Sequence, residues 1–399
     1  MLLEIVLALL LGLIAGTITG LSPGIHINLV AAFLTASIGY FASIPLIVLV
    51  VFIVAMSITH TFLDFIPSIF LGAPEEDSFL SVLPGHQLLK EGKGHEAFVI
   101  TIYGSLTALI IILLFTPLYI LFLPTIFTTI KFAIPFILIF ISLYLILREE
   151  EPFISFVTFS LAGILGFLAF NLPVKEPLMP LLSGLFGLSA LVISLKTKSQ
   201  IQKQKIQPLR QIKLKKKDFF KSIGAILISS PFCAFLPGIG SGHAATIGSE
   251  IISQDRKGFL FLVGATNTII MGLSFITVYA IGKARSGSAA AIQEILKSIS
   301  QTDLIIILAV TIFSGILAAI IGINLSKLCA KYISKVNYTW VTGITIAIII
   351  LVNLFFSNLL GIFILLIATS LGIFTISSNS RRINMMGVLI IPAIIYYIL

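Results

Sequence analysis

Long apolar runs recur along the whole chain, separated by short polar segments. A run of about 20 apolar residues is long enough to cross a bilayer as a helix. The pattern therefore predicts an all-α polytopic membrane protein. The expected spans are Ile44–Phe70, Phe98–Ile120, Thr125–Leu147, Phe153–Phe170 and Leu178–Leu195 in the first half, and Phe259–Ile281, Leu304–Ile323, Tyr338–Phe355, Leu359–Phe374 and Met385–Ile398 in the second.

A proline-glycine signature breaks this pattern twice, once near the start of each half. The first copy, GLSPGIHIN, is residues 20–28, and the second, AFLPGIGSGH, is residues 234–243. A broken helix leaves backbone N–H and C=O groups without partners, and a bilayer tolerates this only where those groups line a polar cavity. A matched pair of breaks is typical of transporters built from two repeats. We expect broken-helix hairpins at Leu2–Tyr40 and Ile223–Ile252, the second being either re-entrant or a pair of short spans.

The composition excludes a water-soluble globular protein. Hydrophobic residues make up 58% of the chain and charged residues 10%, with a mean hydropathy of +1.15. Such a chain has no place for a sizeable soluble domain. Cys233 and Cys329 both lie in apolar surroundings, which gives no disulfide or metal pattern. No cofactor is expected.

The net charge of +9 is concentrated in one central loop, which argues against nucleic acid as a partner. Basic excess in a short loop marks the cytoplasmic side of a membrane protein, where it also faces anionic lipid headgroups. The chain then divides into a first transmembrane repeat at 1–195, a basic cytoplasmic linker at 196–221 and a second transmembrane repeat at 222–399. The basic residues of this loop are Lys196, Lys198, Lys203, Lys205, Arg210, Lys213, Lys215, Lys216, Lys217 and Lys221.

Counting spans outward from the linker predicts opposite orientations for the two halves. Further basic groups at Lys327–Lys335 and Arg381–Arg382 are placed on the cytoplasmic side by the same rule. Each half is then a hairpin followed by about five spans, an odd number, so the two repeats have inverted topology. The loop Gly72–Glu96 falls inside the cell and the segment Gly282–Thr302 outside.

Polar residues within the spans are costly in a bilayer, and each requires a reason. Two polar triplets occupy corresponding places, in the first span after each hairpin, as a shared midplane substrate site requires. His60 and Asp64 are four residues apart and share a helix face. They are either an ion-coupling pair beside the substrate or a mutually satisfied pair that stabilises helix packing. The triplets are Thr59, His60 and Thr61 in the first half and Thr266, Asn267 and Thr268 in the second.

Both signatures supply groups suited to an anion. Helix N-termini expose free N–H groups and a partial positive charge, and glycine lets the backbone approach a carboxylate or phosphate closely. We expect the hairpins to meet near the bilayer midplane and to bind the substrate there, although each histidine alone is also explained as a satisfied interior residue. The expected substrate-binding residues in the signatures are Ser22, Pro23, Gly24, His26, Asn28, Pro237, Gly238, Gly240, Ser241, Gly242 and His243.

Each span that carries a triplet is followed directly by glycine. Gly72 opens a polar loop in the first half, and Gly282 opens the corresponding segment in the second. A solvated connector is the simpler interpretation of both segments. The alternative is that Lys283 and Arg285 attract an anion to that face, although exposed basic residues seldom act specifically.

The order and spacing of these elements resemble the large membrane subunit of tripartite tricarboxylate transporters, the TctA family. The family's glycine-rich Pro-Gly motif is matched by Gly16–Gly24 and Leu236–Gly242, and its glycine-proline turn and charged glycine-rich run by Gly72–Glu76 and Pro84–Ala97. The second half has Thr266–Thr268 in place of the family's asparagine-rich segment. The resemblance implies two inverted repeats and uptake of small carboxylates driven by an ion gradient. It also implies an extracytoplasmic binding protein and a small membrane subunit as partners.

These observations favour a permease of the cell membrane, a secondary active transporter of small organic anions that uses a cation gradient (H+ or Na+) and alternating access. A translocase of polyprenyl phosphate or another lipid phosphate is the alternative, because a hairpin N-terminus suits a phosphate as well as a carboxylate. An enzyme is not expected, because no serine-lysine or paired-aspartate motif lies in a span. A metal site is not expected either, because the run His60–Asp64 lacks the glutamate of H-E-x-x-H.

Overall fold

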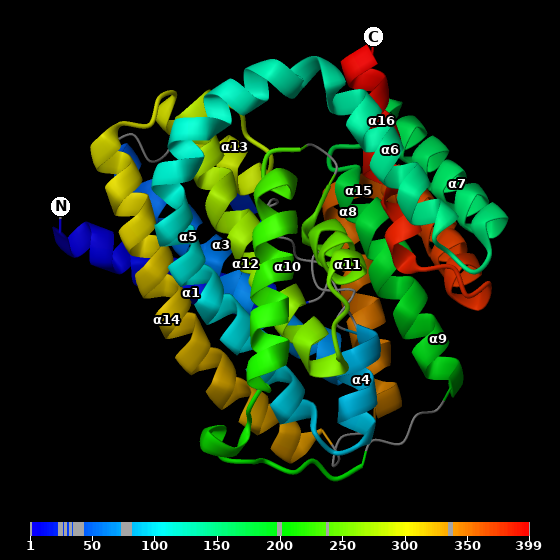
Figure 1. The fold of residues 1–399 in the computed structure, drawn as a ribbon. Coiled ribbons are helices and arrows are strands. Elements are labelled where there is room, and N and C mark those ends of the chain that lie inside the picture. The colour runs from blue at the N-terminus through cyan, green and yellow to red at the C-terminus, as the bar shows by residue number, and fades with distance from the viewer. Residues whose placement is uncertain are drawn as a thin grey trace.

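The computed structural model describes residues 2–22, 27, 30–31, 34, 44–72, 82–197, 202–236, 239–333 and 338–398. All regular elements within these ranges are helices (Figure 1). In the first half they are α1 Leu2–Leu21, α3 Leu46–Leu63, the π-helix η2 Pro67–Leu71, α4 Val82–Lys90, α5 Gly94–Ile130, η4 Lys131–Ala133, α6 Ile134–Leu147, α7 Pro152–Asn171, α8 Leu178–Leu182, the π-helix η5 Ser183–Leu188 and α9 Ser189–Thr197.

The second half is also helical. It begins with a short 3-10 turn, η6 Leu209–Gln211, in the linker, and then contains a hairpin, a long buried helix, a short helix and a longer helix. The elements are α10 Lys216–Cys233, α11 Ser241–Ile251, α12 Arg256–Ile281, α13 Gly287–Leu296, α14 Gln301–Tyr332, α15 Tyr338–Ser377, η7 Arg382–Met386 and α16 Gly387–Ile398. Figure 1 shows α10 and α11 between a group that contains α1, α3, α5, α12 and α14 and a group that contains α6–α9, α15 and α16.

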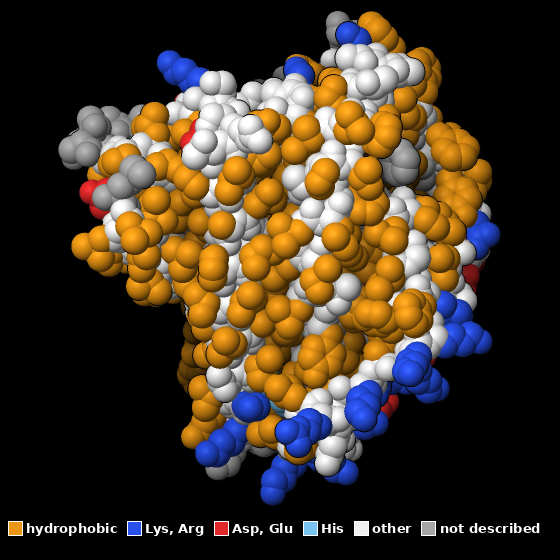
Figure 2. All heavy atoms as spheres, turned by 60° about the vertical axis from the view of Figure 1, so that its left-hand side comes forward, with side chains coloured by type: hydrophobic (Ala, Val, Ile, Leu, Met, Phe, Trp, Pro, Cys, Tyr) orange, Lys and Arg blue, Asp and Glu red, His pale blue; other side chains and the backbone are white. Residues whose placement is uncertain are grey.

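Among the described residues, seven helical segments are long and apolar enough to cross a membrane, which confirms the prediction of a multi-pass membrane protein. Hydrophobic side chains cover most of the face shown in Figure 2, and Lys and Arg gather along its lower edge. The segments Leu46–Leu71 and Arg256–Ile281 are 83% and 94% buried, whereas the other five are 28–44% buried. The two spans that carry the polar triplets are therefore the central helices of the bundle.

One expected turn between spans is placed differently by the structure, and another is confirmed. The sequence predicts a turn between Ile120 and Thr125, but α5 continues to Ile130 and the chain turns at η4. Pro117 and Pro124 lie inside α5. Proline in a helix interior removes one hydrogen bond and bends the helix without necessarily ending it, so these prolines do not produce the expected turn. The expected break after Phe355 is confirmed at Asn358, where φ is 61° within α15.

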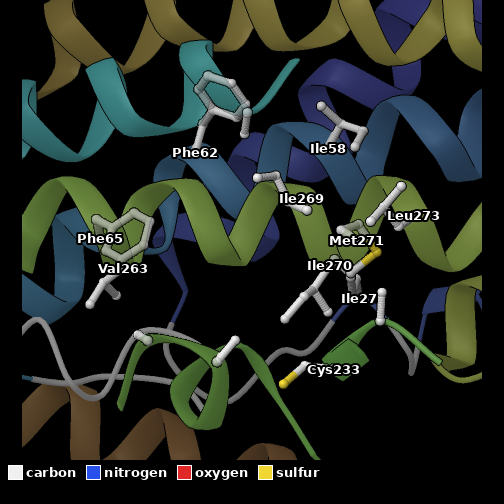
Figure 3. Close-up of a cluster of buried hydrophobic side chains, with 14 of the residues drawn as sticks. Ile27, Ile58, Phe62, Phe65, Cys233, Val263, Ile269, Ile270, Met271 and Leu273 are labelled. Atoms are coloured by element: carbon white, nitrogen blue, oxygen red, sulfur yellow. The ribbon is translucent and has the colours of Figure 1, made fainter. Parts of the chain in front are cut away.

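The length of α11 favours the re-entrant alternative for the second hairpin over a pair of short spans. At about 1.5 Å per residue, the 11 residues of α11 are too short to cross a hydrocarbon core of about 30 Å. One end of α10 lies beside the start of α12, where Ser222 Oγ donates to Gly258 O at 3.2 Å. Its other end reaches the middle of α12, where Cys233 joins the cluster that contains Ile270 and Met271 (Figure 3).

Helices of one half pack against helices of the other. α12 runs parallel to α5, with Gly264 against Thr101 and Thr277 against Tyr119. The corresponding pair, α3 and α14, is also in contact, as are α13 with α3 and α4 with α12. Near the chain's end, α16 packs on α7 while α15 packs on α8, η5 and α9. The two halves therefore pack together as one helical bundle.

Several ion pairs join segments that the charge rule places on the cytoplasmic side. Arg381 contacts Glu149 at 2.6 Å and Glu250 at 2.9 Å, and Arg148 contacts Glu250 at 2.7 Å. Burial alone raises the pKa of Glu250, but hydrogen bonds from Arg381 and Arg148 bring it below its ordinary value. Because the pKa of Glu250 is lowered in the folded state, its ion pairs stabilise the fold at neutral pH. This stabilisation is lost as the pH falls through the lowered pKa.

The linker is held against the same end of the bundle. Gln204 Oε1 accepts from the backbone N–H of Gly94 at 2.8 Å, and the N–H of Lys205 donates to Gly92 O at 2.7 Å. Tyr103 Oη donates to Leu209 O at 3.2 Å. Residues 204–209 of the linker therefore cross the ends of α4 and α5.

A stripe of glycines brings α1 unusually close to α3. Gly12, Gly16 and Gly20 are spaced four residues apart and face α3, and a Cβ at Gly16 would overlap the carbonyl oxygen of Met56. Small residues at this spacing allow helix backbones in a membrane to approach closely. The glycine-rich start of the first signature is thus explained by packing beside Thr59 and Asp64.

We expect Gly16→Ala to lower the stability of the protein by about 1–3 kcal/mol, because the added methyl group overpacks the α1–α3 contact. Gly343→Ala is the matched control, since a Cβ at Gly343 meets no described atom within 4 Å. There the better helix propensity of alanine should leave the protein as stable or slightly more so. Thermal unfolding of both purified variants in detergent measures the difference, and equal midpoints would contradict the close α1–α3 packing.

Candidate functional site

The structure brings the two polar triplets into direct contact at the crossing of α3 and α12. Thr61 Oγ1 and Thr268 Oγ1 are 3.3 Å apart. Asn267 Nδ2 donates to Asp64 Oδ2 at 3.0 Å and to Thr61 O at 3.4 Å. Thr61 contacts Thr268, whereas Asp64, which comes later on α3, contacts Asn267, which comes earlier on α12. The two helices therefore cross antiparallel. Residues at corresponding places in the two halves thus touch one another.

All of these side chains are buried in the core of the protein. Asp64 is 1% exposed, His60 3% and Asn267 2%, and Thr61 and Thr268 are 1% and 0% exposed. Buried polar groups are stable only when they are hydrogen-bonded, because the interior provides no solvent in their place. The contacts across α3 and α12 satisfy that requirement in part, and Thr59 Oγ1 has no hydrogen-bond partner among the described residues.

Asp64 lies where the regular helix of α3 ends. The α-helical segment stops at Leu63, and the chain continues through Ile66 into the π-helix η2, which begins at Pro67. Proline has no N–H to donate, so the hydrogen-bond ladder changes register there. π-Helical turns are frequent at functional sites because they displace side chains and free backbone groups. Gly72 then ends the segment in a left-handed conformation, as Gly282 ends α12, with φ of 66° and 62°.

His60 connects this cluster to α1. Its Nδ1 lies 3.1 Å from Thr19 Oγ1, which is 3% exposed. His60 and Asp64 lie on the same helix, as expected, but the hydrogen bonds given above lead His60 to α1 and Asp64 to α12. The pair is therefore part of a network over three helices. Sequence reasoning missed Thr19, although it lies three residues before Ser22 of the first signature.

The second signature contains the start of a helix, as expected. α11 begins at Ser241, and Gly240, Ser241, Gly242 and His243 are all buried. His243 Nδ1 accepts the backbone N–H of Gly240 at 3.2 Å and so caps the helix that contains it. This contact supports the simpler interpretation of His243 as a satisfied interior residue, at least for that ring nitrogen.

The first signature is described only in part. Ser22 follows the end of α1, is partly buried and donates its backbone N–H to Thr19 O at 3.3 Å. Ile27 is 1% exposed and belongs to the same buried cluster as Cys233, on the opposite side of α12 from Phe62 and Ile58 of α3 (Figure 3). The expected ligands that lie outside the described residues are Pro23, Gly24, His26, Asn28, Pro237 and Gly238.

Arg285 holds the tip of the second hairpin. Its Nε donates to Leu236 O at 3.3 Å, and its Nη2 donates to Ile239 O. These carbonyls flank the proline-glycine pair and are freed from a helix by the break. The simpler interpretation of Arg285 as a solvated surface charge is therefore wrong, because its guanidinium satisfies the backbone of the signature. Lys283, two residues earlier, is exposed.

The cluster offers hydroxyl, amide, imidazole and carboxylate groups within one polar region at the centre of the protein. A carboxylate with neighbouring hydroxyl and amide oxygens is suited to a small cation such as Na+ or to a proton, and the N-terminus of α11 is suited to an anion. The part of the chain that the structure describes contains no group of three or more His, Cys, Asp or Glu side chains arranged to hold a metal ion.

Comparison with known proteins gives a family match over nearly the whole chain. The profile described as "Tripartite tricarboxylate transporter TctA family" matches residues 6–387. The chain is also 34% identical over 400 residues to "Uncharacterized protein MJ1079" of Methanocaldococcus jannaschii, with 95% of each chain covered. No solved structure matches the chain.

We expect Arg285→Gln to loosen the tip of the second hairpin. Hydrogen bonds from a charged donor contribute about 1.5–3 kcal/mol each, so backbone amides of 234–243 should exchange with deuterium about tenfold faster or more. Lys283→Gln removes the same charge from the same segment and should leave exchange unchanged. Hydrogen–deuterium exchange with mass spectrometry makes the comparison. Equal protection in both variants would show that Arg285 does not hold the tip.

Proposed function

Since the chain belongs to the TctA family of transporter membrane subunits, we propose that it is a secondary active transporter of small organic anions, most simply carboxylates. The observation that carries the proposal is the contact between the two polar triplets at the crossing of α3 and α12. Intramembrane polar clusters mark substrate and ion pathways because their burial is otherwise costly. In repeat-built transporters such clusters lie at the repeat interface, beside broken helices.

The proposed substrate site lies between the hairpins and this crossing. The N-terminus of α11 begins directly after the second signature, and its free N–H groups favour an anion. Ser241 and Gly242 lie at this helix start, and α10 ends beside the middle of α12, the helix that carries Thr266, Asn267 and Thr268. Ile27 places part of the first hairpin in the same buried cluster. We include the signature residues outside the described ranges in this site as a prediction.

The proposed coupling group is Asp64, with His60 beside it on α3. The buried carboxylate accepts a hydrogen bond from the neutral amide of Asn267, which solvates it without cancelling its charge. A cation or proton that binds beside Asp64 interacts directly with this carboxylate. Binding at the contact between the halves allows the cation to favour one arrangement of α3 and α12 over another, which is what coupling requires.

Alternating access follows from the proposed inverted repeats. α3 and α12, which hold the same place in the two halves, cross antiparallel, and each packs against the long helix of the other half. Two repeats related in this way give two states of similar energy, open to opposite sides of the membrane. As implied by the family, we propose that an extracytoplasmic binding protein delivers the anion and that a small membrane subunit assists.

A translocase of lipid phosphates is the second candidate function. An apolar groove between α5 and the second hairpin is lined by Phe122 and Phe235, and Phe122 is exposed toward the bilayer. A hairpin site that adjoins such a groove is what a substrate with a long hydrocarbon tail needs. Transport assays with carboxylates and with a short-chain prenyl phosphate distinguish the two functions.

We predict that Asp64→Asn abolishes gradient-driven accumulation of labelled citrate in proteoliposomes with an imposed Na+ or proton gradient. Accumulation should fall by about tenfold or more, which corresponds to a loss of about 1.4 kcal/mol of coupling free energy or more. Exchange of internal for external substrate should persist in part. Glu294→Gln is the matched control, because Glu294 is an exposed carboxylate on α13. Accumulation by Asp64→Asn equal to that of the parent would show that Asp64 is structural.

The inverted topology predicts opposite labelling of two exposed lysines, Lys213 in the linker and Lys283 after α12. In a background with Cys329→Ser, a membrane-impermeant maleimide added to intact cells should label Lys283→Cys and leave Lys213→Cys unlabelled until the cells are opened. The native Cys233 is buried and should not react. Labelling of both positions in intact cells would rule out the inverted repeats.

A further inference from the structure

A lateral groove of about 250 Å³ separates the outer half of α5 from the second hairpin. One wall consists of Phe115, Leu118, Tyr119 and Phe122 on α5, and the other of Pro231 and Phe235 at the end of α10. The Tyr119 hydroxyl is turned toward Thr277 Oγ1 on α12, at 3.2 Å, so the groove surface itself is hydrocarbon. The carboxylate-transport proposal and the polar cluster do not use these side chains, whereas the lipid-phosphate alternative does.

The groove faces the bilayer and not water. Its rim residues Leu118 and Phe122 are 51% and 53% exposed, and their exposed neighbours on α5, Leu114 and Leu121, are 69% and 67% exposed. α5 belongs to one of the segments able to cross the membrane. Exposed apolar side chains on such a helix lie against lipid tails, so the mouth of the groove opens into the hydrocarbon region.

Water is a poor occupant of such a space. An apolar cavity of this size stays free of ordered water and takes up apolar molecules, because no wall group offers hydrogen bonds. Lipid tails are the apolar groups present at this depth. A single flexible chain can enter a groove that a rigid helix of a second protein would be too wide to enter.

We propose that the lateral groove binds one acyl chain of a bilayer phospholipid, and that this chain packs the second hairpin against α5. The hairpin is then held from two sides, by Arg285 at its tip carbonyls and by lipid against Pro231 and Phe235. The binding site itself does not depend on the identity of the transported substrate. If the proposed function is correct, lipid in the groove also influences the site formed at the start of α11.

Photocrosslinking tests the proposal directly. The protein is reconstituted in vesicles that contain a phosphatidylglycerol with a diazirine in its acyl chain, and the crosslinked peptides are mapped by mass spectrometry. The expected result is crosslinking to the 231–235 segment, in excess of that to exposed apolar residues of α14 such as Phe313 and Ile320. Crosslinks distributed only according to exposure would overturn the proposal.

Filling the groove provides the specific control. Leu118→Trp places an indole in the groove and should reduce crosslinking at 231–235 by about tenfold, since the displaced methylene groups lose their buried contact. Leu121→Trp adds the same indole on the same helix outside the groove and should have no effect. If Leu118→Trp does not fold, Leu118→Phe makes the same test with less bulk. Equal crosslinking in the filled and control variants would overturn the proposal.

A competition experiment identifies the source of the chain. Unlabelled phosphatidylglycerol should reduce the crosslinks in proportion to its mole fraction, and a prenyl phosphate should compete no better than phospholipid does. Displacement by a small fraction of prenyl phosphate would overturn the assignment to an acyl chain. Carboxylate uptake is tested separately, by citrate accumulation in proteoliposomes. Failure of this inference and failure of the proposed transport function are therefore distinguishable.

Discussion

The structure depends on one constraint, that polar groups within a membrane protein must find their partners inside the protein. Asp64, His60 and Asn267 lie on the two most buried of the membrane-crossing segments that the structure describes, and each is at most 3% exposed. Their hydrogen bonds to one another and to Thr19 determine how α1, α3 and α12 face each other. The same constraint explains Arg285, which satisfies backbone carbonyls that the proline-glycine break has freed. His60, Asp64, Asn267 and Arg285 thus each have a hydrogen-bond partner inside the protein.

Close helix packing makes this arrangement possible. The glycine stripe on α1 places its backbone against α3 directly beside Thr59 and Asp64, so no bulky side chain separates the polar groups from α1. Packing between helices in a membrane relies on such contacts, because lipid tails provide no hydrophobic driving force between apolar surfaces. The hydroxyl of Thr59 lies in this close contact without a hydrogen-bond partner among the described residues.

Much of this organisation could be predicted from the sequence. The apolar runs predict the spans, because a helix needs about 20 apolar residues to cross a bilayer. The two triplets are recognisable because polar residues are rare inside apolar runs. The prediction of a turn between Ile120 and Thr125 is wrong, because Pro117 and Pro124 lie inside α5 without ending it. The role of Arg285 could not be predicted, since its partners are backbone carbonyls 49 and 46 residues away in the chain. The contact of Thr61 with Thr268, 207 residues apart, likewise depends on tertiary packing.

The central claim is that an anion binds between the start of α11 and the crossing of α3 and α12. An experimental structure determined by electron cryomicroscopy with citrate and Na+ in saturating amounts tests it most directly. Our account predicts ligand density in contact with residues 240–243 and with Asn267 or Thr268, and cation density beside Asp64. Ligand density on an outer surface of the bundle, with the region between α11 and α12 filled only by protein, would contradict it.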